Sequence, residues 1–165
     1  MNHPPIIAVV GRSGSGKTTL IEQLIPELRR RGRRVGAVKH THHSFDLDPS
    51  GKDSWRLFHA GAPVVAFASN SQLVVMRHLE REASLDEIVT RYLDDVEVVL
   101  VEGYKELPLR KIEVVRSGEE LLCSLDELIA VVSDDRRDLR VPTFRPVDVG
   151  PLAALVETTA FESSA

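Results

Sequence analysis

The chain has 165 residues, 42% of them hydrophobic, and its 21 basic and 25 acidic residues give a formal net charge of −4 at pH 7. This length suits one compact domain over residues 1–165, and the negative charge gives no positive field that would attract nucleic acid or an anionic membrane. A single cysteine excludes an intramolecular disulfide, and the lack of a signal-peptide pattern or a long apolar run predicts a soluble, cytoplasmic protein.

The first part of the chain shows a strand, a helix and a second strand. Residues 6–10 form a short apolar run rich in β-branched side chains, which predicts a strand buried on both faces. A helix is predicted over residues 17–31, ended by Gly32, because apolar side chains recur at helical spacing: Leu20, Ile21, Leu24, Ile25 and Leu28. Residues 35–39 are the next predicted strand and complete a right-handed βαβ unit.

The rest of the chain continues this alternation, with one interruption. In chain order we expect a helix, two strands, a helix, three strands and a final helix: 53–60, 64–68, 73–76, 84–93, 96–101, 112–115, 128–132 and 150–159. The first two of these strands are close enough in sequence to form a β-hairpin. The pattern predicts a three-layer α/β domain with a mostly parallel, doubly wound sheet and a β-hairpin insertion.

A glycine-rich segment joins the first strand to the first helix. Residues 11–18, Gly-Arg-Ser-Gly-Ser-Gly-Lys-Thr, match the phosphate-loop pattern G-x-x-x-x-G-K-[ST] at every position. Glycines let backbone N–H groups point at phosphate oxygens, and the helix N-terminus adds positive potential. We expect Lys17 to reach the β- and γ-phosphates and Thr18 to bind Mg²⁺. The domain is therefore predicted to be a P-loop NTPase that binds a nucleoside triphosphate.

An acidic residue at the end of the strand predicted over 96–101 is the candidate partner of this loop. In phosphate-loop proteins, a carboxylate at the end of a second central strand holds Mg²⁺ or orients the attacking water. Glu102 has this position, and Gly103 lets the chain turn away after it. The alternative is an ordinary solvated carboxylate at a strand end. We favour Glu102 as the metal-binding and catalytic acid.

A polar segment follows the second strand, where ligand sites of α/β sheets lie. It contains Lys39, His40, His42, His43 and Asp48 within ten residues. This composition favours contacts with phosphate, Mg²⁺ or a cofactor over a zinc site, which would need three or four convergent ligands. A solvated polar loop is the plain alternative.

Three further patterns are weaker. The Gly51–Ser54 run suggests a helix opening over phosphate, with Lys52 as the counter-charge, or a simple N-cap by Asp53 or Ser54. The Ser133–Asp135 turn suggests either a place where a nucleobase is read or an exposed turn. The five arginines between Arg29 and Arg34 complement the dipole of their own helix and receive no specific partner. The guanine-reading N-K-x-D motif of small GTPases is missing, so the residues alone do not distinguish GTP from ATP.

Taken in order, these motifs resemble the molybdopterin-guanine dinucleotide biosynthesis adapter family, MobB. The segments that carry the resemblance span about residues 6 to 145 and are Gly11–Thr19, Val38–His43, Gly51–Ser54, Ala60–Ala62, Val101–Lys105 and Lys111–Val114. The resemblance implies a GTP-binding adapter, a homodimer and at most a weak GTPase. Its partners would be the molybdenum cofactor guanylyltransferase, which attaches GMP to molybdopterin, and related cofactor-assembly proteins.

The resemblance also implies which residues form the site. The nucleotide would be bound by Gly11, Ser13, Gly14, Ser15, Gly16, Lys17, Thr18, Thr19, Lys39, His40, His42, Asp48, Lys52 and Asp53. Thr18 and Glu102 would serve Mg²⁺. Two positions depart from the family pattern, because Ser50 separates Pro49 from the Gly51–Ser54 run and Tyr104 replaces the commoner phenylalanine.

Two other classes of function share parts of this pattern. A small-molecule kinase has the same loop but needs an acceptor pocket and a mobile lid with arginines, and no clear lid segment is visible. A metal-insertion GTPase is suggested only by the histidines at positions 40, 42 and 43.

Overall fold

The computed structural model describes residues 3–41 and 51–161. The chain divides into two compact units, which we name the sheet unit, residues 1–40 and 88–165, and the hairpin unit, residues 41–87. The single domain expected over residues 1–165 remains a prediction. Among the described helices, none is both long enough and apolar enough to cross a membrane.

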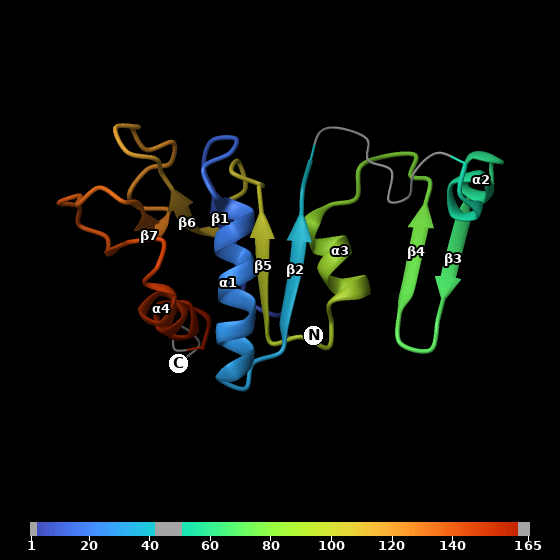
Figure 1. The fold of residues 1–165 in the computed structure, drawn as a ribbon, viewed down its shortest axis with the longest axis horizontal. Coiled ribbons are helices and arrows are strands. Elements are labelled where there is room, and N and C mark those ends of the chain that lie inside the picture. Colours follow the sequence, from blue (N-terminus) through green and yellow to red (C-terminus); the bar gives the residue numbers. More distant parts are fainter. Residues whose placement is uncertain (1–2, 42–50, 162–165) are drawn as a thin grey trace. The chain divides into compact units, whose positions relative to one another are not determined.

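The sheet unit is built on six described strands in the order β2-β5-β1-β6-β7-β8, all paired in parallel (Figure 1). Their bounds are β1 Ile6–Val10, β2 Val35–Lys39, β5 Val98–Glu102, β6 Arg110–Val114, β7 Leu128–Val132 and β8 Thr143–Phe144. The predicted parallel α/β sheet is confirmed. The short edge strand β8 was not predicted, because its two residues are too few to show a hydrophobic period.

Helices cover both faces of this sheet. The helices α1, Lys17–Arg30, and α4, Val149–Phe161, pack on one face and on each other around a core that includes Leu24, Leu28 and Val156. Helix α3, Leu85–Tyr92, ends just before Leu93, whose side chain lies at Gly36 on the opposite face. These contacts agree with the three layers expected from the sequence.

The hairpin unit contains helix α2, Asp53–His59, and the strands β3, Val64–Ala68, and β4, Leu73–Arg77. The two strands pair antiparallel, with Val64 opposite Arg77 and Ala68 opposite Leu73. The Ser69 hydroxyl accepts a hydrogen bond from the Gln72 backbone N–H at 3.0 Å, which helps to close the turn. The predicted hairpin is therefore confirmed.

The strand register brings the ends of three strands together. Lys39 at the end of β2 and Val9 in β1 are both in register with Glu102, the last residue of β5. The phosphate loop begins directly after β1. Because all three strands are parallel, the loop and the two charged residues share the carboxyl edge of the sheet, where α/β proteins bind ligands.

Candidate functional site

The backbone of the loop between β1 and α1 requires its glycines. Gly11, Gly14 and Gly16 have φ angles of +142°, +69° and +104°, a region that favours glycine. A Cβ at Gly11 would also lie 2.3 Å from the Val114 carbonyl oxygen in the neighbouring strand β6. The loop therefore passes so close to β6 that only glycine fits at its first position.

Two polar side chains at the phosphate loop, Lys17 and Ser15, are available to bind a ligand. The Lys17 Nζ donates a hydrogen bond to the Arg12 carbonyl oxygen at 2.9 Å, so the lysine side chain folds over its own loop. The Ser15 Oγ is buried and has no hydrogen-bond partner among the described residues. Burying a hydroxyl without a partner costs about 1–3 kcal/mol. The Lys17 ammonium can therefore exchange its bond to the Arg12 carbonyl for one to a ligand oxygen, and the Ser15 hydroxyl can gain a hydrogen bond to such an oxygen.

Thr18 and Glu102 form the direct link between α1 and β5. The Thr18 Oγ1 donates to Glu102 Oε2 at 2.7 Å, and the Lys39 Nζ lies 3.4 Å from Glu102 Oε1. The Glu102 side chain is only 13% exposed, but Lys39 is 63% exposed, so water still screens this ion pair in part. The structure thus brings Thr18 and Glu102 together at one edge of the sheet.

The chemistry of this pair fits Mg²⁺. Mg²⁺ takes oxygen ligands, and it is bound through one or two protein groups together with substrate phosphates and waters. Thr18 and Glu102 supply such oxygens. No group of three or more histidine, cysteine, aspartate or glutamate side chains able to hold a metal occurs in the parts of the chain described. A metal held here would therefore draw further ligands from a phosphate group.

His40 lies beside Glu102, and its backbone N–H donates to the Glu102 carbonyl oxygen at 3.0 Å. Its ring stacks on Tyr104, with ring centroids 4.3 Å apart and planes inclined by 28°. A Cβ at Gly103, whose φ is +105°, would lie 3.3 Å from the His40 Cβ. Tyr104 itself has a φ of +51°, unusual for a residue other than glycine. The Gly103-Tyr104 turn thus lets the chain after β5 lie against the chain after β2.

The other predicted site residues fall into three groups. Ser13 lies in the loop and Thr19 in the first turn of α1. Lys52 and Asp53 belong to the hairpin unit, where Lys52 is the N-cap residue of α2, without a capping side-chain bond, and Asp53 is its first helical residue. The alternative in which Asp53 or Ser54 serves as the N-cap is therefore wrong. His42, His43 and Asp48 lie outside the described residues, so their roles remain predictions.

Arg116 is a loop contact that the sequence reasoning missed. Its guanidinium donates a hydrogen bond to the Gly14 carbonyl oxygen. Arg137 Nη2 donates to the Glu119 carbonyl at 2.6 Å, and Asp135 accepts from the Ser117 hydroxyl at 2.7 Å. The hydrogen bond from Ser117, with a second from the Gly118 N–H, holds the pKa of Asp135 below its ordinary value. The only signal in the sequence was the position of Arg116 just past a strand that neighbours β1.

A second charged motif is structural. Lys111 in β6 is fully buried and its Nζ lies 2.5 Å from Glu127 Oε1, an interaction that lowers the pKa of Glu127. The buried Glu113 carboxylate accepts the backbone N–H groups of Leu122 and Cys123 at 2.6 and 3.1 Å. Burial also raises the pKa of the Cys123 thiol. Lys111 and Glu113 therefore anchor the connection from β6 to β7, whereas Val114, at the end of the same segment, borders the phosphate loop.

With this geometry established, comparison with known proteins identifies the family. The family model described as molybdopterin guanine dinucleotide synthesis protein B, MobB, matches residues 6–134. The chain belongs to the MobB family. The match begins at β1 and ends just after β7, so it includes the phosphate loop, Glu102 and the Arg116 turn.

Two curated MobB relatives are named molybdopterin-guanine dinucleotide biosynthesis adapter protein. The one from Haemophilus influenzae is 40% identical over 134 residues, covering 80% of this chain and 75% of the relative. The one from Escherichia coli K12 is 39% identical over 160 residues, covering 92% and 91%. A crystal structure of molybdopterin-guanine biosynthesis protein B (mobB) superimposes with a TM-score of 0.76 at 35% identity, covering 94% of this chain and 98% of that one. The fold is therefore that of MobB structures.

Proposed function

We propose that this MobB protein is a GTP-binding adapter that assists the attachment of GMP to molybdopterin. The observation that carries the proposal is the 2.7 Å hydrogen bond between Thr18 and Glu102, which joins a complete phosphate loop to an acid at the end of β5. The names of the relatives supply the pathway, since they are adapter proteins of molybdopterin-guanine dinucleotide biosynthesis.

In this proposal the loop binds the triphosphate by exchanging internal contacts for phosphate contacts. Lys17 leaves the Arg12 carbonyl, and its ammonium pairs with the β- and γ-phosphates. The buried Ser15 hydroxyl gains a partner, and the loop N–H groups and the first turn of α1 supply further donors. A hydrogen bond from the Lys17 ammonium to a charged phosphate oxygen is stronger than its present bond to the neutral Arg12 carbonyl, so the exchange favours binding.

Thr18 and Glu102 would hold the Mg²⁺ that accompanies GTP, which would supply neutralisation of the phosphate charge. Glu102 is also the residue that orients water for hydrolysis. Each of its two carboxylate oxygens already has one protein contact, Thr18 on Oε2 and Lys39 on Oε1, and these contacts compete with a water for the acceptor positions of the carboxylate. Slow hydrolysis, in which holding the nucleotide counts for more than cleaving it, follows from this competition.

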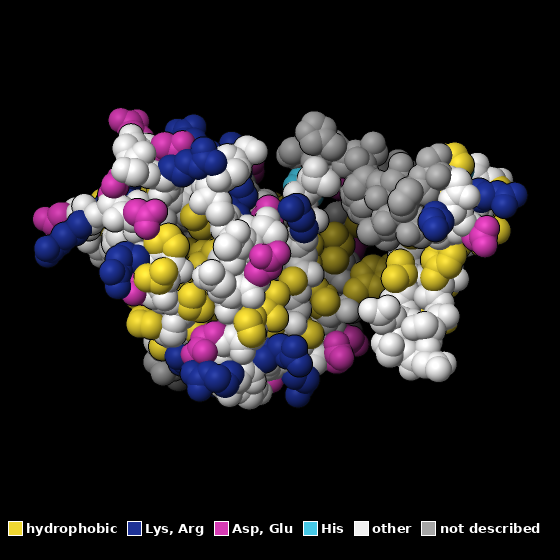
Figure 2. All heavy atoms as spheres, viewed as in Figure 1, with side chains coloured by type: hydrophobic (Ala, Val, Ile, Leu, Met, Phe, Trp, Pro, Cys, Tyr) yellow, Lys and Arg dark blue, Asp and Glu magenta, His cyan; other side chains and the backbone are white. Residues whose placement is uncertain are grey.

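The hairpin unit is the proposed site of homodimerisation. Leu73, Val74 and Val75 in β4 are 68%, 42% and 45% exposed, and hydrophobic side chains are visible on the surface of this unit in Figure 2. A two-stranded hairpin is marginally stable alone, and its open edges favour pairing with another chain. Replacing both Leu73 and Val75 by lysine should convert a dimer into a monomer in analytical ultracentrifugation. An unchanged sedimentation coefficient would exclude this surface.

The adapter role is tested by reconstitution with the guanylyltransferase, molybdopterin and Mg²⁺·GTP. Adding the full chain should increase the yield of guanylylated cofactor, and the Lys17→Ala variant should lose most of this increase. Tight GTP binding without any effect on guanylylation would contradict the adapter role while leaving the nucleotide site intact.

A further inference from the structure

We infer that a pocket at the carboxyl ends of β7 and β8 receives the base of the nucleotide, and that Asp134 selects guanine there. The pocket has a volume of about 630 Å³ and is lined only by residues 133–148 of the sheet unit. The inference rests on the proposed binding of a nucleoside triphosphate by the phosphate loop and adds the residue that determines base specificity.

The position of the pocket suits a base whose phosphates lie in the loop. The sheet order β1-β6-β7 places β7 two strands from β1. With neighbouring strands about 4.8 Å apart, this separation is roughly 10 Å, a span that a ribose and an α-phosphate can cover. Both features lie at the carboxyl edge of one parallel sheet, so a single ligand can contact both.

One turn connects the loop to the pocket through hydrogen bonds. Arg116 donates to the Gly14 carbonyl of the phosphate loop. The next two residues, Ser117 and Gly118, donate to the carboxylate of Asp135, which lines the pocket, at 2.7 and 2.8 Å. The two parts of the proposed site are therefore held in a fixed relation by residues 116–118.

The pocket walls combine apolar surface with polar atoms that lack partners. Leu139, Val141, Pro142 and Phe144 give it an apolar side suited to the faces of a flat ring. Two buried atoms of lining residues, Thr143 Oγ1 and Arg137 Nε, have no hydrogen-bond partner within the described parts of the chain. This mixture of apolar walls and a few unsatisfied polar groups is typical of a site for a small molecule.

Most of the charged groups at the pocket are already paired. Of the four arginines that line it, three are already engaged: Arg137 with backbone carbonyls, Arg140 with Asp126 at 2.6 Å and Arg145 with Asp148 at 3.1 Å. The fourth, Arg136, is exposed and forms no hydrogen bond or ion pair with a described residue. Asp135 is occupied by Ser117 and Gly118. Asp134, by contrast, is exposed and forms no hydrogen bond or ion pair with any residue that the structure describes. The free charged acceptor at the pocket is therefore the Asp134 carboxylate.

A carboxylate acceptor distinguishes guanine from adenine. Guanine presents its N1–H and its 2-amino group side by side, and a carboxylate can accept both hydrogen bonds. The corresponding edge of adenine has an unprotonated ring nitrogen, which would face the carboxylate as a second acceptor. A site built to accept these donors discriminates against a ligand that lacks them.

The test is isothermal titration of the full chain with GTP, ATP and XTP, each with Mg²⁺. The variant is Asp134→Asn, whose amide can donate to the 2-carbonyl group of xanthine. The control is Asp138→Asn, which removes the same charge from an exposed residue that does not line the pocket. We expect Asp134→Asn to weaken GTP binding by about 10- to 100-fold, to strengthen XTP binding and to leave ATP binding nearly unchanged. The control should bind all three like the wild type.

Three outcomes would overturn the inference. Equal affinity of the wild type for GTP and ATP, with no effect of Asp134→Asn, would remove base selection while leaving the proposed triphosphate site standing. An equal loss of all three nucleotides in Asp134→Asn would show a structural role for the side chain. If the wild type binds none of the nucleotides, the proposed function itself fails and this inference fails with it.

Discussion

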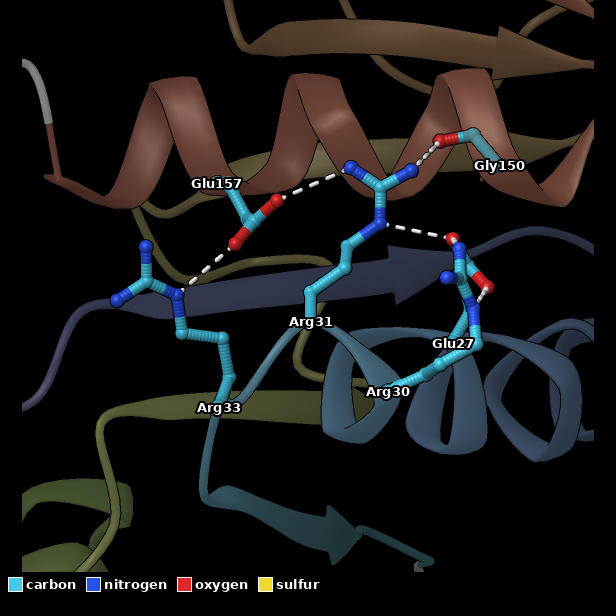
Figure 3. Close-up of polar contacts among 6 residues, drawn as sticks. All are labelled: Glu27, Arg30, Arg31, Arg33, Gly150 and Glu157. Atoms are coloured by element: carbon cyan, nitrogen blue, oxygen red, sulfur yellow. Dashed lines mark hydrogen bonds and ion pairs between the residues drawn. The ribbon is translucent and has the colours of Figure 1, made fainter.

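The two ends of helix α1 use charged residues in opposite ways. At its last turn, a set of residues that we name the α1–α4 junction joins α1 to α4: Glu27, Arg30, Arg31, Arg33, Gly150 and Glu157 (Figure 3). Arg31 contacts Glu27 at 2.8 Å, Glu157 at 3.1 Å and the Gly150 carbonyl at 2.9 Å. Every charged side chain in this set has a charged partner. The junction is therefore satisfied without a ligand.

At the first turn of α1, roughly 20 Å away at 1.5 Å per residue, the contacts are incomplete. Among the residues that the structure describes, Lys17 is bonded only to the backbone of its own loop, and the Ser15 hydroxyl has no partner. The comparison shows that a charge-rich segment stabilises the fold where its charged side chains pair with one another. Such a segment is a candidate ligand site where several of its polar groups lie together without protein partners.

The largest difference between the two ends of α1 should be seen in nucleotide affinity, with the Lys17→Ala variant. Removing the ammonium group removes charge-assisted hydrogen bonds to the phosphates, so affinity for Mg²⁺·GTP should fall by about 10- to 100-fold in calorimetric titration. The matched control is Arg30→Ala, which removes one positive charge from the junction end of the same helix and should bind GTP like the wild type. Equal losses in both variants would show that general charge, and not the loop, governs binding.

Glu102→Gln should reduce hydrolysis more than binding. The amide keeps one oxygen for Mg²⁺ but orients water poorly, so single-turnover phosphate release should slow by about tenfold or more, while GTP affinity changes only a few-fold. Glu97→Gln is the control, since Glu97 accepts the backbone N–H of Arg34 at 2.9 Å near the amino ends of β2 and β5. A Glu102→Gln variant that hydrolyses GTP at the wild-type rate would remove the catalytic assignment.

Glu27→Gln should leave binding unchanged and lower stability by a smaller amount. Hydrogen bonds from Arg30 and Arg31 lower the pKa of Glu27 from 4.5 to about 2. Because the folded-state pKa is lowered, the ionised carboxylate stabilises the fold above pH 4.5, and this contribution is lost as the pH falls toward 2. The midpoint of thermal unfolding should therefore drop by a few degrees at pH 7, and this gap should close under acid conditions.

The control for this prediction is Glu22→Gln, on the exposed side of the same helix, which makes no ion pair with any described residue. Its unfolding midpoint should match that of the wild type at both pH values. A gap between Glu27→Gln and the wild type that stays constant down to pH 2 would contradict the ionic origin of the effect.

Most of the fold could be predicted because its strands have strong local signals. The bounds of β1, β2, β3 and β7 agree with the predicted ranges, since each strand is a short run rich in apolar residues. The hairpin followed from two such runs separated by a short polar turn. Strand β8 could not be predicted, because pairing with β7 alone defines its two residues.

The candidate site could be predicted where its residues follow the carboxyl ends of parallel strands. Thr18 and Glu102 lie 84 positions apart, yet both follow from motifs at the carboxyl edge of a parallel sheet. The reach of Arg116 to Gly14 was not predictable, because it depends on β6 being the neighbour of β1. The arginines after α1 had no visible partner for the same reason, since Glu157 comes 126 positions after Arg31.

The most direct test is a crystal structure of the chain with Mg²⁺ and a non-hydrolysable GTP analogue. We predict phosphates inside the loop, with Lys17 moved from the Arg12 carbonyl to a phosphate oxygen, Mg²⁺ beside Thr18 and Glu102, and the α1–α4 junction unchanged. An analogue bound elsewhere, or bound at the loop with Lys17 still on Arg12 and Thr18 distant from Mg²⁺, would contradict the proposed site.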